Sequence, residues 1–171
     1  LSLTEAEQIA RRQVVEMISL LKANVPAFKH AYLQKMAAHI GVRESRRVMG
    51  RYVLTADEIL GAAKFEDGIA RSVYPVDIHN PAGTGTVLKH LPEGEYYEIP
   101  FRCLVPQRAH NLLIGSRCIS ATHEAHSSLR VMPVVAGIGE AAGIAAALCA
   151  QRGLNITQVD GREVREIIFS K

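Results

Sequence analysis

The sequence has 171 residues, of which 48% are hydrophobic and 22% charged, a composition that suits a folded unit with a sizeable buried core. A net charge of +3, 5% aromatic residues and no Trp argue against nucleic-acid binding, which relies on a basic footprint and base-stacking side chains. Three widely spaced cysteines without a CxxC pair argue against a disulfide framework and a zinc knuckle, so we expect a reducing, cytoplasmic setting.

Residues 1–40 are predicted to form a helical hairpin. Thr4 is a candidate N-cap, and apolar residues recur at helical spacing up to Lys22. Pro26 opens a second helix that is expected to continue to Ile40. The start of the chain is charged and amphipathic and does not resemble a signal peptide. Because the chain begins at Leu1 without an initiator Met, we expect it to be truncated.

Residues 41–171 are predicted to form one α+β portion, so the expected fold class is α+β, with a small sheet and a buried helix of small residues. An arginine-rich stretch opens this portion, and Thr55 with Asp57 is expected to cap a short helix ending at Leu60. The pattern also predicts a second helix at 64–71, a loop at 79–85, and strands at 48–54, 73–78, 96–103 and 111–115.

A helix dominated by Ala, Gly, Val and Ile is predicted from Pro133 to Ala150, and a shorter one at 163–169. Glu140 interrupts the apolar run of the long helix, so a buried core helix is favoured over a membrane span. The first turn of such a helix has unpaired N–H groups, which can stabilise an anion such as a phosphate or a reduced flavin ring.

Several motifs resemble the family of FAD-dependent oxidoreductases, in which the C-terminal region has a strand of the form NLLxxGR, then CISATHEA, then a helix that opens with RVMP. The matching segments here are 111–117, 118–125 and 130–133. Segments 41–47, 52–57, 74–79 and 99–106 resemble further signatures of that family in the same order. The family also has an N-terminal GxGxxG turn for the FAD pyrophosphate, which this sequence lacks.

The resemblance implies the C-terminal part of an oxidoreductase whose full-length form transfers a hydride from a small-molecule substrate to FAD. It implies that FAD binding needs the missing N-terminal segment and that the chain alone is inactive. It also implies roles for His79 and His123 as acid, base or hydrogen-bond partner, while Arg130 is the best candidate for holding a substrate carboxylate. The residues that would face the flavin are Gly115, Ser116, Arg117, Pro133, Val134 and Gly137.

Some of these residues also have other interpretations. His123 and His126 are three residues apart rather than the four of a zincin helix, so no metal site is expected. Cys103 and Cys118 lack a CxxC partner and are interpreted as packing residues. A hydrolase would need a nucleophile motif that the sequence does not have. The alternative function is a non-catalytic partner-binding or subunit module, in which exposed apolar surface on the N-terminal helices would allow homo-oligomer formation.

Overall fold

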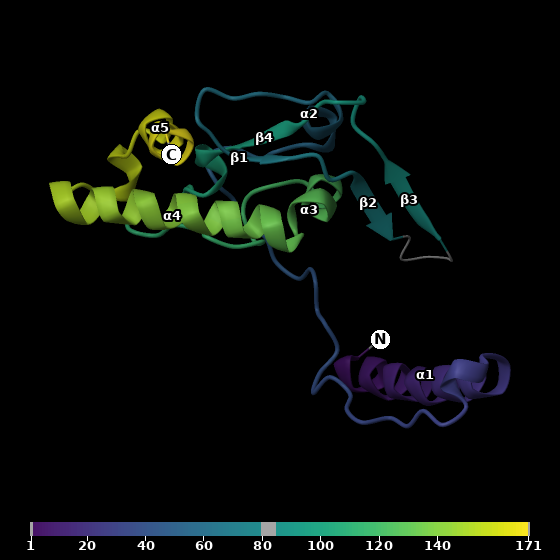
Figure 1. Cartoon of the computed structure of the whole chain (residues 1–171). Helices are drawn as coiled ribbons and strands as arrows, with labels where there is room; N and C mark the ends of the chain where they lie inside the picture. The colour runs from purple at the N-terminus through teal and green to yellow at the C-terminus, as the bar shows by residue number, and fades with distance from the viewer. Residues whose placement is uncertain (1, 80–84, 171) are drawn as a thin grey trace. The chain divides into compact units, whose positions relative to one another are not determined.

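The computed structural model describes residues 2–79 and 85–170, and the chain divides into two units, residues 1–43 and residues 44–171 (Figure 1). Most of the predicted loop at 79–85 lies outside the described residues. The second unit combines helices with two small antiparallel sheets, which makes the fold class α+β.

The first unit is built on one long helix, α1 (Leu3–Asn24). Ser2, not Thr4, is its N-cap, and Ser2 and Glu5 form a reciprocal capping box. The helix ends just before Pro26, and a short 3₁₀ helix, η1 (Pro26–Phe28), follows.

The second helix of the predicted hairpin is absent from the described residues of the first unit, where the chain after η1 is irregular. Side chains of α1 hold this segment through its backbone: Glu7 accepts from the N–H of Ile40 at 2.6 Å, and Arg11 donates to the carbonyl of Ala38 at 3.0 Å. A helix in a protein gains most of its stability by packing an apolar face against other elements, and in the first unit α1 has no buried side chain that would provide such packing. The helical spacing of apolar residues after Pro26 was therefore not sufficient to predict a helix.

The sheets of the second unit each contain two antiparallel strands. In the first, β1 (Gly68–Ser72) pairs with β4 (Tyr97–Pro100), with an irregularity between Gly68 and Ala70. In the second, β2 (Val76–His79) pairs with β3 (Thr86–Lys89). The predicted helix at 64–71 was wrong because its second half is β1, whose residues are buried at four of five positions.

Two predicted strands are not strands in the described structure. The segment 48–54 makes only isolated bridges, Gly50 with Pro106 and Leu54 with Ala121. The segment 111–115 is irregular, and Leu112 is half exposed, so it is not the buried strand that its apolar run suggested. Both segments run beside η2 (Phe101–Cys103) and the chain that follows it: the N–H of Arg51 donates to Val105, and that of Ile114 to Leu104.

Four α-helices complete the described part of the second unit. The predicted α2 (Ala56–Leu60) has the expected Thr55 cap, whereas α3 (His123–Leu129), capped by Thr122, was not predicted. Helix α4 (Met132–Arg152) ends at Gly153, whose φ of 65° favours glycine. After η3 (Ile156–Gln158), α5 (Gly161–Phe169) ends the described chain.

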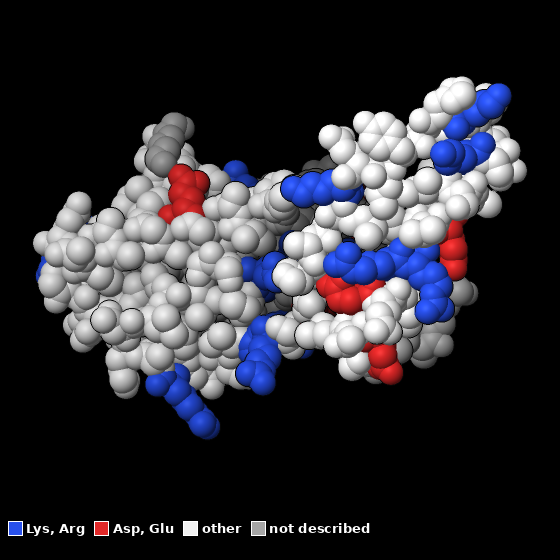
Figure 2. All heavy atoms as spheres, turned by 90° about the horizontal axis from the view of Figure 1, so that it is seen from below, with Lys and Arg blue, Asp and Glu red and all other residues white. Residues whose placement is uncertain are grey.

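Helix α4 packs one side against β1 and α5, as the core-helix prediction required (Figure 1). Its buried residues are Val134, Ile138, Ala141, Ala145 and Leu148. By length and composition it is also the one helix among the described residues that could cross a membrane, and 28% of its most apolar window is buried. Figure 2 shows few charged side chains on the face over α4.

The core of the second unit lies where β1 and β4 meet α3, α4 and α5, and Tyr97, Ile99, Ile119 and Leu129 are fully buried there. Close backbone packing surrounds this core. A Cβ on Gly161 would lie 2.7 Å from that of Phe101, and a Cβ on Gly50 would lie 2.8 Å from that of Ser120. Any side chain at either position would force its neighbours apart.

Candidate functional site

Glu44 gathers four side chains that can carry positive charge. Its Oε1 lies 2.9 Å from Nδ1 of His123, and its Oε2 lies 3.4 Å from Nδ1 of His126 and 3.9 Å from the guanidinium of Arg130. The guanidinium of Arg47 also donates to Oε1. We call these five residues the Glu44 cluster.

Burial and charge act against each other in the Glu44 cluster. Burial by itself would raise the pKa of Glu44, but the hydrogen bond from His123 and the nearby charges of His126 and Arg47 outweigh it and lower the pKa. Burial lowers the pKa of His126, more than the attraction of Glu44 raises it. Glu44 is therefore ionised at neutral pH, while His126 resists protonation.

Helix α3 positions both histidines of the cluster. The side chain of Thr122 caps its first turn, and every residue from Ala125 to Leu129 is buried. The Ser127 hydroxyl accepts from the N–H of Asp77 at 2.9 Å, and the Ser128 hydroxyl donates to the carbonyl of Tyr74 at 2.7 Å. These bonds tie α3 to the start of β2, so the histidines are held on a rigid element.

The two histidines have different environments. The His126 side chain is 2% exposed, and its Nδ1 has no hydrogen-bond partner within the described part of the chain. The His123 side chain is 55% exposed. His123 can therefore exchange a proton with a bound molecule, whereas His126 can act only through its neighbours.

The Glu44 cluster lies next in sequence to the start of α4. Arg130 is the C-cap of α3, and Val131 alone separates it from Met132, the first residue of α4. Val131 is the N-cap and provides no side-chain hydrogen bond, so the first N–H groups of this 21-residue helix lack a side-chain cap. Such a helix start favours a negative charge.

The residues predicted to face a flavin have mixed environments. Gly115 and Arg117 in the loop before α3 and Pro133 in the first turn of α4 are exposed. The Ser116 hydroxyl is 3.0 Å from the sulfur of Cys118. Val134 is 5% exposed and belongs to the core.

Two of the predicted flavin-facing glycines contribute to packing. A Cβ on Gly137 would lie 3.3 Å from that of Ala70 in β1, and one on Gly115 would lie 3.0 Å from that of Ala142 in α4. Gly115 thus packs against the middle of α4, beyond the first turn. Contact of any of the six predicted residues with a flavin stays a prediction.

The structure brings two of the three predicted catalytic residues together, since His123 and Arg130 share the carboxylate of Glu44. His79 is the last residue of β2, and its side chain lies outside the described residues. Glu44 was missed as a site residue, and the only signal for it in the sequence is that it is the sole acid in the arginine-rich stretch 43–51. Its partner His123 lies 79 residues away along the chain.

Within the described residues, no group of three or more His, Cys, Asp or Glu side chains is arranged to hold a metal ion.

The cysteine environments differ from one another. Cys103 is buried, and burial raises its pKa to about 12, so its thiol stays protonated and packs as an apolar group.

Comparison with protein families matches residues 1–168 to the model of the FAD dependent oxidoreductase family. The chain belongs to this family. No curated protein and no solved structure matches the chain. Membership extends over both units, including the first unit, for which the sequence motifs had been few.

The described residues fit one part of FAD better than the other. The uncapped start of α4 suits the ring, which becomes negatively charged on reduction, and Arg130 and His123 lie beside it in sequence. For the pyrophosphate, the expected cradle is a strand, a glycine-rich turn and a helix in a parallel sheet. The strands of the described chain pair only antiparallel.

Proposed function

We propose that this chain forms the part of an FAD-dependent oxidoreductase that faces the flavin ring and the substrate, and that the enzyme transfers a hydride from an anionic small molecule to FAD. The observation that carries the proposal is the Glu44 cluster, which gathers an exposed imidazole and two guanidinium groups immediately before the uncapped start of α4. FAD, when bound, supplies the hydride acceptor.

The chain's own residues then have distinct roles. Arg130 and Arg47 hold the substrate carboxylate, since guanidinium groups bind carboxylates in a bidentate way. His123, whose Nδ1 is held by Glu44, exchanges a proton with the substrate through Nε2. Glu44 keeps both arginines and the ring of His123 in place. The first N–H groups of α4 stabilise negative charge on the reduced ring.

The role of α4 can be tested at Met132, which is 87% exposed and can be replaced without disturbing the core. The whole chain is titrated with FAD, and flavin fluorescence and thermal stability are followed, because a ligand of the native state raises its apparent stability. Any binding of FAD by the chain without the N-terminal segment that the resemblance implies should be weakened several-fold by Met132→Asp through repulsion. Met132→Asn is the neutral control and should bind as the wild type does. Equal affinity of the two variants would contradict the role of α4, and absence of FAD binding would show that the pyrophosphate needs the N-terminal segment.

The substrate class can be tested under anaerobic conditions with the chain joined to the N-terminal FAD-binding segment that the family resemblance implies. Small carboxylates that carry an oxidisable C–H next to an alcohol or amine are added, and loss of the oxidised flavin absorbance is recorded. We expect bleaching by one or more of them, slowed at least tenfold by Arg130→Gln at subsaturating substrate. Arg130→Lys should restore part of the rate, because it keeps the charge but not the bidentate geometry. Faster bleaching by uncharged alcohols would argue against an anionic substrate.

A second candidate function is a non-catalytic module that binds another copy of the chain through α1. The observation that favours it is that α1 buries no residue, while Leu3, Ile9, Met17 and Leu20 are all more than 40% exposed. The acidic residue of its first turn is Glu5 and the basic residue of its last turn is Lys22, so antiparallel pairing of two copies brings opposite charges together.

Sedimentation velocity distinguishes this module from a monomeric enzyme. If α1 pairs with a second copy, the wild-type chain sediments as a dimer at micromolar concentration, and Met17→Glu with Leu20→Glu converts it to a monomer. Gln8→Glu, on an exposed polar position of the same helix, is the control and should leave the dimer intact. A monomeric wild-type chain would exclude this candidate.

A further inference from the structure

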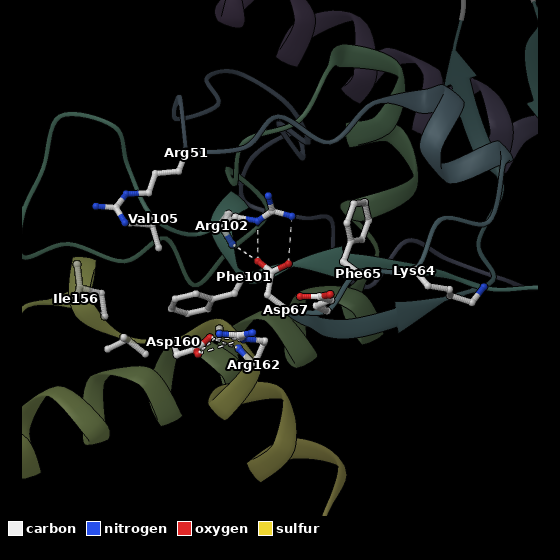
Figure 3. A pocket seen from close by; sticks show the side chains of 13 residues that line it. Arg51, Lys64, Phe65, Asp67, Phe101, Arg102, Val105, Ile156, Asp160 and Arg162 are labelled. Atoms are coloured by element: carbon white, nitrogen blue, oxygen red, sulfur yellow. Dashed lines mark hydrogen bonds and ion pairs between the residues drawn. The ribbon is translucent and has the colours of Figure 1, made fainter.

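The second unit contains a cavity of about 470 Å³ that none of the predicted flavin or substrate residues lines (Figure 3). Four segments far apart in the sequence form it, at Arg51, Lys64–Asp67, Phe101–Val105 and Ile156–Arg162. Its volume falls in the range of roughly 300–1,000 Å³ that is typical of small-molecule sites. We propose that this cavity, the Arg51 cavity, binds a small monocarboxylate with an aromatic or branched apolar body.

The apolar lining of the Arg51 cavity belongs to the core of the unit. Phe101, Val105 and Ile156 are each less than 5% exposed, and Phe65 and Val159 add partly buried apolar surface. In Figure 3 the ring of Phe101 lies between the paired Arg102 and Asp67 on one side and Asp160 and Arg162 on the other. A ligand body placed here replaces water against apolar surface, which favours an aromatic or branched group.

Most charges around the cavity already have partners. Arg102 donates to both oxygens of Asp67, at 2.9 and 3.2 Å, and Arg162 pairs with Asp160 at 3.0 Å (Figure 3). Lys64, at the edge, pairs with Glu95 at 3.2 Å. These pairs leave little charge for a ligand to neutralise.

Arg51 differs from the other cations of the cavity. Its guanidinium donates to the carbonyl of Thr157 at 3.2 Å, and it forms no ion pair within the described residues. Among the four cations of the lining, Arg51 is the one whose positive charge no described acid pairs with, because Lys64 pairs with Glu95 outside the lining. A monoanion matches that charge, whereas a dianion such as a phosphate would be repelled by Asp67, Glu66 and Asp160.

The walls are held in place without a ligand. The N–H of Arg51 donates to the carbonyl of Val105 at 2.9 Å, and the guanidinium of Arg102 stacks over the ring of Tyr52. Gly161 packs tightly on Phe101 and Asp67, which fixes the start of α5 against η2. Binding therefore requires little ordering of the protein, and this lowers its entropic cost.

The test measures binding of three probes to the whole chain by isothermal titration calorimetry: 2-naphthoate, the neutral 2-naphthalenemethanol and the dianionic 2-naphthyl phosphate. We expect 2-naphthoate to bind at least tenfold more tightly than either of the others. Arg51→Gln should weaken 2-naphthoate binding at least tenfold, and the control Arg108→Gln, an exposed arginine outside the cavity, should not. Arg51 is also exposed, so its replacement leaves the core intact.

Val159→Trp provides an independent check, because an indole at this partly buried position fills the cavity and should abolish binding of all three probes. Three results would overturn the proposal: no binding of 2-naphthoate up to millimolar concentration, equal binding of the neutral probe, or unchanged affinity in Arg51→Gln. Because FAD is absent from this experiment, its outcome is independent of the proposed flavin chemistry.

Discussion

At the scale of single residues, Glu98 shows how one buried carboxylate joins several segments. Its side chain is 1% exposed, accepts two hydrogen bonds from Arg165 at 2.8 and 3.0 Å, and accepts others from Arg71 and the N–H of Phe65. Burial alone would raise its pKa, but the bonds from Arg165 and Phe65 and the nearby positive charge lower it. Glu98 thereby connects β4 to β1 and α5.

Replacing Glu98 removes the charge that these partners surround. We expect Glu98→Gln to lower the free energy of unfolding by about 3 kcal/mol, because breaking a buried ion pair leaves the arginines without compensation. Urea denaturation followed by circular dichroism measures the change. The matched control is Glu163→Gln, which removes an exposed pair with Arg152 and should cause no measurable loss. Equal effects of the two substitutions would contradict the role assigned to Glu98.

His126 makes the stability of the folded chain depend on pH. Burial lowers the pKa of His126 in the folded chain, so the unfolded chain binds more protons just below the ordinary histidine pKa of about 6.5. The contribution of His126 to stability is therefore complete above that pH and is lost as the pH falls toward the folded-state value. The carboxylates Glu44 and Glu98 have lowered pKa values, so their contributions are lost only below about pH 4.5.

We therefore expect the stability of the wild type to decrease between pH 7 and pH 5, and His126→Gln to show a shallower decrease. Glutamine keeps a donor near the position of the ring nitrogen that bonds the backbone of Arg117. Urea midpoints at half-unit pH steps measure the slope. A parallel decrease in both proteins would show that other groups cause the pH dependence.

At the scale of elements, local sequence signals predicted the helices with clear start signals correctly. The same signals predicted the strands and their pairing partners poorly. The Thr55 cap of α2, the proline in the first turn of α4 and the small residues of α4 were visible in the sequence and are confirmed. The helix at 64–71 and the strand at 111–115 were wrong because the burial of β1 and the exposure of Leu112 depend on residues far along the chain. The same holds for the Glu44 cluster, which long-range contacts assemble.

Helix α4 allows packing and propensity to be separated. A Cβ on Gly143 would meet only open space, so Gly143→Ala should raise the free energy of unfolding by about 0.5–1 kcal/mol through helix propensity. Gly137 faces Ala70 of β1, and Gly137→Leu should lower it by about 1–3 kcal/mol through overpacking. Thermal and urea denaturation of both variants measure these effects. Stabilisation by both would show that α4 does not pack on β1 as described.

At the scale of the whole molecule, the two units differ in how much they bury. All buried residues of the described chain lie between Gly50 and Val164, and thus in the second unit. The first unit has 43 residues, and its helix has no buried side chain. It therefore buries less apolar surface than a chain of that size usually needs to fold alone.

The second unit should therefore fold independently. We expect a chain of residues 44–171 to unfold cooperatively, with a thermal midpoint within a few degrees of the full chain. Residues 1–43 alone should lose their helix gradually on heating. Differential scanning calorimetry and circular dichroism test both statements. Loss of the cooperative transition in the shorter chain would show that the first unit contributes to the core.

The close packing at Gly50 and Gly161 also has an evolutionary meaning. Because a Cβ at either position would come within 3.0 Å of buried neighbours, only glycine is compatible with this backbone there. In an alignment of the family, both columns should be glycine even among members with different substrates. Invariance at these two positions would record the geometry of the core, and the columns that separate one substrate class from another should be sought among exposed side chains such as His123.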